Sequence, residues 1–119
     1  MINQVILVGR LVDNPVLYET ENGKTVTTIT LAVNRSFKNS NGDYDTDFIR
    51  CTLWQGLAQS TSEYCEKGST VGIKGRLSNR TIKIDHLPDG EKTPIETPFN
   101  LKMMEVIAEK ITFISSKRN

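Results

Sequence analysis

DFIRCTLWQGLAQSTSEYCEKGSTVGIKG, residues 47–75, places a strand, a helix and a second strand end to end, and the other predicted elements are arranged around it. Side chains of a strand alternate between two faces, so Ile49, Cys51 and Leu53 form one apolar face that offers a core. The other face carries Phe48 and Trp54 with a cation between them. Core packing of these rings is the alternative, but aromatic rings interleaved with cations suit stacked nucleobases and phosphates.

Length and charge limit the range of functions. A chain of 119 residues with an ordinary apolar fraction makes one domain with one modest core, and we expect that domain at residues 1–114, followed by a short basic end at 115–119. The net charge of +1 argues against a generally basic nucleic-acid-binding coat. Residues 34–83, however, hold eight Lys and Arg against five acids, a local excess of three positive charges.

The two cysteines and the first strand indicate the compartment. Cys51 and Cys65 fit buried free thiols better than a disulfide framework, which indicates a reducing environment. The apolar run at residues 5–8 is too short for a signal peptide or a membrane span. We therefore expect a soluble cytoplasmic protein without membrane contact.

Hydrophobic periodicity predicts five strands and one helix. Residues 57–67 show helical periodicity, and Gly68 is expected to end that helix. Residues 78–100 hold three of the four prolines and the turn Asp89-Gly90, which predicts a projecting hairpin. The strands are predicted at residues 4–11, 25–34, 48–54, 70–77 and 101–114. The centre of the first strand is expected to be buried on both faces. Helix is an alternative for residues 101–110. A glycine inside the first strand, Gly9, marks a bend, a bulge or the close approach of another backbone.

This order predicts the fold class. Three strands, a helix and two strands are the order of an all-β, five-stranded Greek-key barrel of the OB type. In that fold the helix between the third and fourth strands closes one end of the barrel. The hairpin between the fourth and fifth strands is expected to be extended. SH3-like barrels lack a long helix at this point.

Five segments, taken together, resemble the bacterial and phage single-stranded DNA-binding proteins. In order, they are NQVILVGRLVDNPVL, ITLAVNRSF, DFIRCTLWQGLA, SEYCEKGSTVGIKGRL and MEVIAEKITF, which together span Asn3 to Phe113. Each segment alone is weak evidence for the family, but five segments in the same order are a specific signal. The resemblance implies an OB-fold homo-oligomer, commonly a tetramer with Ile6 and Val8 as contacts between copies, that binds single strands and catalyses nothing. The chain ends in SSKRN where long members continue to an acidic tail, so it resembles a short form, phage-encoded or accessory.

The resemblance also implies a site. Aromatic positions that stack on bases fall on Phe37, Phe48 and Trp54, and a fourth falls on Ile82, which has no ring. Tyr44 is predicted as a compensating ring. Predicted phosphate contacts are Arg10, Arg35, Lys38, Arg50, Lys74, Arg76, Arg80 and Lys83.

Other chemistries find little support in the sequence. Asp43, Asp45 and Asp47 alternate, but no glycine and distal glutamate complete a calcium loop, so a polar hairpin is expected and neither a metal nor a cofactor. The only histidine, His86, cannot form a zinc cluster. No residue is marked as a catalytic nucleophile. The alternatives left open are an OB-fold adaptor for a replication or recombination protein and, after it, an OB-fold nuclease.

Overall fold

The computed structural model describes residues 1–86 and 93–115, without the side chains of residues 85 and 86. The turn predicted at Asp89-Gly90, the imidazole of His86 and the end at 116–119 lie outside the described residues. The elements, in chain order, are β1 (Val5–Leu11), β2 (Tyr18–Glu19), β3 (Thr25–Lys38), β4 (Tyr44–Trp54), α1 (Gly56–Tyr64), β5 (Thr70–His86) and β6 (Pro94–Ser115).

The strands form a closed barrel with mixed pairing. Their order is β1-β5-β6-β4-β3-β2, and an additional pairing of β1 with β3 joins the two sides. β4 and β6 run parallel at Cys51–Val106 and Thr52–Ile107, whereas every other pair is antiparallel. The predicted all-β barrel of the OB type is therefore confirmed. The two-residue strand β2 adds a sixth strand that the sequence did not predict.

The core is formed by inward-facing residues of the strands and of α1. These are Leu11, Ile29, Leu31, Cys51, Leu53, Ala58, Cys65, Val71, Ile73, Val106 and Ala108. The predicted apolar face of β4 is thus confirmed as a core face. The prediction that the centre of β1 is buried on both faces is wrong, since Ile6 is 70% exposed and Val8 is also exposed. Alternation directs these two side chains out of the barrel.

Gly9 permits the barrel to close at β1. A Cβ built on it would lie 2.7 Å from the carbonyl oxygen of Ala32 and 2.9 Å from a methyl group of Val33. β1 therefore approaches β3 more closely than a side chain would allow. The predicted close approach of another backbone is confirmed.

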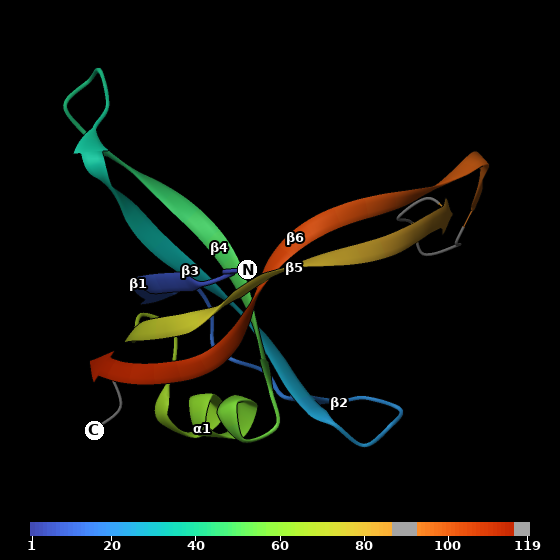
Figure 1. The fold of residues 1–119 in the computed structure, drawn as a ribbon, viewed down its shortest axis with the longest axis horizontal. Coiled ribbons are helices and arrows are strands. Elements are labelled where there is room, and N and C mark those ends of the chain that lie inside the picture. The colour runs from blue at the N-terminus through green and yellow to red at the C-terminus, as the bar shows by residue number, and fades with distance from the viewer. Residues whose placement is uncertain (87–92, 116–119) are drawn as a thin grey trace.

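Helix α1 lies across one end of the barrel (Figure 1) and contacts β3, β4 and β6. Tyr64, at its last turn, lies against Phe113 of β6, with ring centroids 5.5 Å apart. The helix ends at Tyr64 and not at Gly68, so the predicted stop is wrong. The backbone of Cys65 is already extended, and its side chain is buried in the core. Gly68, with φ of 90°, belongs to the following turn, where its N–H donates to the carbonyl oxygen of Leu11.

Two long hairpins leave the barrel as arms (Figure 1). One is formed by the ends of β3 and β4, and the other by β5 and β6, which pair from Thr70–Ser115 to His86–Pro94. The predicted projecting hairpin is confirmed, and strand pairing extends much further along it than the sequence indicated. Residues 101–110 are strand, so the helical alternative is wrong.

Candidate nucleic-acid interface

The outer face of β4 carries the rings that the sequence singled out. Phe48 is 67% exposed and Trp54 is 38% exposed, so core packing of these rings is excluded for the single chain. Thr52 lies between them in the alternation but is buried where β4 pairs with β6, and its hydroxyl donates to the carboxylate of Glu105 at 2.9 Å. On the outer face of β4, the exposed rings of Phe48 and Trp54 are therefore separated by the hydrogen bond from Thr52 to Glu105 of β6.

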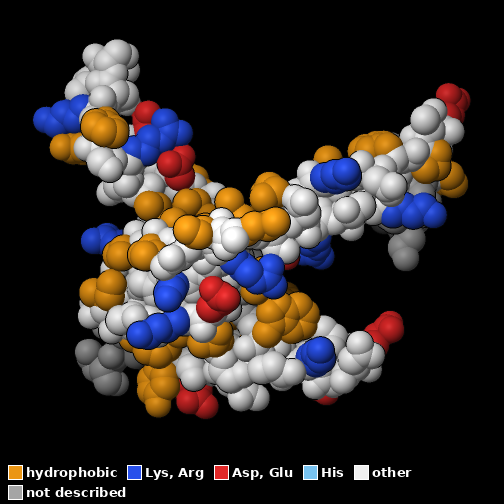
Figure 2. Space-filling model, viewed as in Figure 1, with side chains coloured by type: hydrophobic (Ala, Val, Ile, Leu, Met, Phe, Trp, Pro, Cys, Tyr) orange, Lys and Arg blue, Asp and Glu red, His pale blue; other side chains and the backbone are white. Residues whose placement is uncertain are grey.

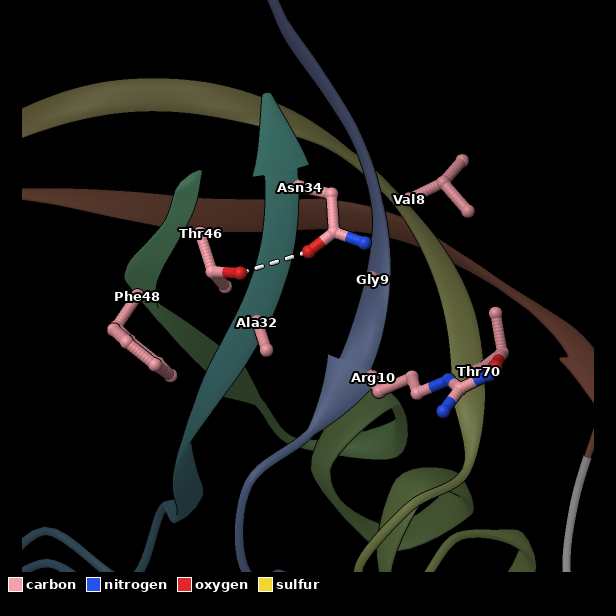
Figure 3. Close-up of a pocket in the computed structure, with 8 residues that line it drawn as sticks. All are labelled: Val8, Gly9, Arg10, Ala32, Asn34, Thr46, Phe48 and Thr70. Carbon is pink, nitrogen blue, oxygen red and sulfur yellow. Dashed lines mark hydrogen bonds between the residues drawn. The ribbon is translucent and has the colours of Figure 1, made fainter. Parts of the chain in front are cut away.

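An open groove of about 640 Å³ lies beside Phe48. Its other walls come from β1, β3 and β5, and Arg10 projects along it with its guanidinium near Thr70 (Figure 3). At the far wall a hydrogen bond joins β3 and β4: the Thr46 hydroxyl donates to the side-chain oxygen of Asn34 at 2.8 Å (Figure 3). The groove thus brings together one predicted stacking ring and one predicted phosphate contact.

Trp54 lies at a sharp change of backbone direction. The next residue, Gln55, has φ of 56° and ψ of −124°, a conformation that favours glycine, and its amide donates to Thr25 at 2.8 Å. A shallow hollow beside the indole is lined by Gln55 and by the β2–β3 turn, including Lys24. Lys24 is a candidate phosphate contact that the sequence analysis missed. The Asn22-Gly23 turn signal adjoining it was visible, but nothing local related that turn to Trp54.

The β3–β4 arm carries two further predicted rings. Phe37 is 83% exposed near the end of β3. Lys38 pairs across the hairpin with Tyr44, and its ammonium lies 5.8 Å from the ring centroid. The arm therefore presents the exposed ring of Phe37 and, near it, the ring of Tyr44, which already has the ammonium of Lys38 over it.

Arg35, on the same arm, is engaged by acids. Its guanidinium donates to both carboxylate oxygens of Asp47, and Asp45 lies 3.8 Å away. The hydrogen bond to Arg35, with charge attraction added, holds the pKa of Asp47 below its ordinary value, and the same bond raises the pKa of Arg35. Asp45 also accepts from Asn39. Of the three alternating acids, Asp45 and Asp47 thus hold the polar hairpin together through their carboxylates, and Asp43 takes part through its backbone, which bonds to Asn39.

A second group of cations lies where the β5–β6 arm leaves the barrel. Arg50 of β4 and Arg80 of β5 line one small hollow together with Ile82, Met103 and Glu105. Ile82 occupies the position where the resemblance implied a ring. Its neighbours in that hollow are two methionines, two arginines and the carboxylate of Glu105, so a largely apolar and cationic surface continues from β4 onto the arm.

The remaining predicted cations lie apart from the rings. Lys74 pairs with Ile6 of β1 and Lys110 of β6, on the wall where those strands meet. Arg76 pairs with Ile107, one strand away from Thr52. Lys83 pairs with Asn100 on the arm, with the opposite parity to Arg80, and so points to the other face.

Apolar and basic side chains also lie together on the surface. Hydrophobic side chains gather along the barrel between the two arms and on the β5–β6 arm, with Lys and Arg among them (Figure 2). In the described ranges, 1–86 and 93–115, no three His, Cys, Asp or Glu side chains come together as a metal site. Among the same residues, no helix has the length and apolar character needed to cross a membrane.

Comparison with known proteins identifies the family. The model of the single-strand binding protein family matches residues 2–114. Single-stranded DNA-binding protein B of Bacillus subtilis strain 168 is 42% identical over 117 residues, which cover 98% of this chain and 94% of the relative. Single-stranded DNA-binding protein 3 of Listeria innocua is 39% identical over 119 residues, covering 100% and 68%. The single-stranded DNA-binding protein of Bacillus cereus is 40% identical over 117 residues, covering 98% and 62%.

These relatives bear on two expectations from the sequence. They are named for binding DNA, so the alternative of an adaptor protein is not favoured. They come from bacteria, and the expectation of a phage origin gains no support from them. The matched range and the identities agree with the five sequence segments and with the barrel, and the chain belongs to the single-strand binding protein family.

Proposed function

We propose that this chain binds single-stranded DNA without reading its sequence, in the cytoplasm, and that it neither catalyses a reaction nor holds a cofactor. The observation that carries the proposal is the outward placement of Phe48 and Trp54 on β4, whose opposite face is the core. The two rings share this outer face with Arg50, an arrangement that suits stacked bases and phosphates. The names and identities of the relatives support DNA as that partner.

The binding mechanism follows from groups that every nucleotide offers. A base presents a flat ring face, so Phe37, Phe48, Trp54 and Tyr44 would stack on bases whatever their identity, each contributing about 1–3 kcal/mol. A phosphate presents a negative charge, which Arg10, Arg50 and Arg80 would neutralise beside those rings. The other proposed phosphate contacts are Arg35, Lys38, Lys74, Arg76 and Lys83.

Salt dependence provides a quantitative expectation. Each phosphate neutralised on a single strand lowers the slope of log affinity against log salt by about 0.7, so about six contacts give a slope near −4. Arg35 contributes little to this count while Asp47 holds it. A slope near zero would contradict a phosphate-binding surface.

Tryptophan fluorescence tests the proposal directly. Trp54 is the only tryptophan of the chain, so its emission reports on the proposed surface alone. Titration with oligo(dT) is expected to quench it, with an affinity that falls as salt is raised. An emission that stays unchanged, together with free migration of a labelled oligo(dT), would contradict the function. Incubation of the DNA with Mg²⁺ is expected to leave it intact, and degradation abolished by a chelator would favour a nuclease.

Association of several copies is part of the same proposal. Ile6 and Val8 are exposed side by side on the outer face of β1, and we propose that a second copy covers them in a homotetramer. Light scattering of the wild type and of an Ile6→Lys variant tests this, since a charge in that contact should shift the population to smaller species. A recombinase or a replication protein is the proposed class of protein partner, and capture that survives nuclease treatment tests it.

A further inference from the structure

The β5–β6 arm carries an aromatic ring to which neither the sequence pattern nor the resemblance assigned a role. Phe99 of β6 is 52% exposed and lies opposite Ile84 in the antiparallel ladder. The position where a ring was expected, Ile82, lies one alternation further in on the neighbouring strand. Phe99 is therefore close to the expected ring position in space, although it is 17 residues away in sequence.

The register places Phe99 on the same face as Ile82. Between Ser78–Glu105 and Ile84–Phe99 the pairing continues without a shift, and paired residues of an antiparallel ladder point to the same side. Alternate pairs therefore form one strip along the arm: Arg80 with Met103, Ile82 with Leu101, and Ile84 with Phe99. Leu101 and Met103 are exposed, so the strip is an open apolar surface.

The strip is continuous with the proposed stacking surface of β4. Its inner end, Arg80 and Ile82, lines the same hollow as Arg50, which lies between Phe48 and Trp54 on β4. Phe99 lies four residues beyond Met103, which corresponds to about 14 Å at the rise of a strand. A strand of DNA crossing Arg50 and continuing outward would therefore meet Arg80 first and the ring of Phe99 last.

Charge also favours a polyanion over an apolar partner. The inner end of the strip presents two guanidinium groups, and the one carboxylate in that hollow, Glu105, already accepts a hydrogen bond from Thr52. A polymer of phosphates and flat bases matches a surface that presents arginines at its inner end and apolar side chains beyond them.

We propose that Phe99 supplies the base-stacking ring of the β5–β6 arm and that single-stranded DNA lies along the strip from Arg50 to Phe99. The inference rests on the proposed function, since it extends the same DNA path onto the arm. Phe99 takes the place of the missing ring at Ile82 from the neighbouring strand. The aliphatic side chains of Ile82 and Leu101 would support the bases between the two rings.

Moving the only tryptophan tests the proposal. In a Trp54→Phe, Phe99→Trp double variant the single indole reports on the arm, and its quenching by oligo(dT) is expected. A Trp54→Phe, Asn100→Trp variant is the matched control, because Asn100 is the next residue and pairs with Lys83 on the opposite face, where a phosphate contact but no stacked base is proposed. Anisotropy of a labelled oligo(dT) establishes in parallel that each variant binds.

The outcomes separate the two proposals. If wild-type Trp54 is not quenched and labelled DNA does not bind, the proposed function fails. If DNA binds but the indole at position 99 is unaffected, or is quenched no more than that at position 100, the role of Phe99 is overturned. Emission at position 99 that changes with protein concentration, and not with DNA, would assign the strip to a second copy and would also overturn it.

Affinity provides an independent measurement. Phe99→Leu, which keeps an apolar side chain but removes the ring, is expected to weaken binding of a long oligo(dT) about fivefold or more, the effect of losing one stacked base. Phe99→Tyr should restore wild-type affinity, and Asn100→Ala should not change it. Equal affinity of the leucine and tyrosine variants would contradict stacking.

Discussion

Arg35 and Asp47 form a two-pronged ion pair on the β3–β4 arm, in which the guanidinium Nε and Nη2 both donate to the carboxylate, at distances of 2.9–3.2 Å. Asp47 lies next to Phe48 in sequence, and Arg35 lies two residues before Phe37 on the same arm. A phosphate that approaches Arg35 must therefore displace Asp47 and tolerate its negative charge. Asp47 thus acts as an internal competitor of the ligand that we propose.

Asp47→Asn is expected to strengthen binding of oligo(dT) by up to about fivefold, the range of an exposed ion pair. It should also steepen the salt dependence by about 0.7, because Arg35 gains a phosphate. Fluorescence titration at several salt concentrations measures both. Because the pKa of Asp47 is lowered, its carboxylate stays ionised at pH 5–8, and the gain should be constant across that range.

Asp43→Asn is the matched control for this variant. It removes one charge from the same hairpin, but Asp43 is not among the acids that contact Arg35. An equal gain from both substitutions would mean that general repulsion, and not release of Arg35, is responsible.

Phe48→Ala and Trp54→Ala are each expected to weaken binding about 5-fold to 150-fold, the range for losing one stacked base. Both side chains lie on the outer face of β4, so thermal unfolding should change little. Anisotropy of labelled oligo(dT) is the suitable measurement, since Trp54→Ala removes the intrinsic reporter. Wild-type affinity in both variants would exclude the β4 face as the binding surface.

Gly9→Ala should destabilise the fold by about 1–3 kcal/mol, because the new methyl group would overlap the carbonyl oxygen of Ala32. Chemical denaturation measures the loss. Gly56→Ala at the start of α1 is the control, because no atom lies within 4 Å of its Cβ position and alanine favours a helix. Destabilisation of both variants to the same extent would show that the contact of β1 with β3 is not the cause.

Cys51 predicts a change of stability at alkaline pH. Burial raises the pKa of its thiol to about 12, from an ordinary value of 9.0, so the unfolded chain loses the proton first as pH rises. The contribution of the neutral thiol is complete below pH 9 and decreases between pH 9 and about 12, by at most about 1.4 kcal/mol per pH unit.

The measurement compares wild type with Cys51→Val, which fills the site with an apolar side chain of similar size. The stability difference between the two proteins should be constant from pH 7 to about pH 9 and should then move in favour of the valine variant. A difference independent of pH would contradict the burial of the thiol. Comparing the two proteins cancels the lysines and tyrosines that titrate in the same range.

Most of the barrel could be predicted because its signals are local. Alternation on β4 assigned Cys51 and Leu53 to the core, and the glycine at position 9 indicated a close backbone approach. The end of α1 was misplaced because Gly68 is a strong local stop signal. The helix in fact ends where burial of Cys65 requires extended backbone.

The candidate site depended more on contacts that are distant in sequence. The capture of Arg35 by Asp47 joins residues 12 apart, and Lys24 meets Trp54 only through the fold. Phe99 was overlooked because its place beside Ile82 depends on the cross-strand register, which residue spacing within one strand does not reveal. The rings Phe48 and Trp54 and the cation Arg50, by contrast, share the single strand β4 and could be found from alternation alone.

Between Gly75–Ala108 and Ile84–Phe99, β5 and β6 pair without a change of register, and this sets a rule for how the arm can change length in evolution. Adding one residue to each strand would turn the outer part of the arm over and carry Phe99 to the opposite side, whereas adding two to each would return it to the same side. Insertions and deletions that keep the ring of Phe99 on the face of Ile82 should therefore occur in steps of two per strand. The length of the arm can then differ among relatives, while the face that carries the ring stays the same.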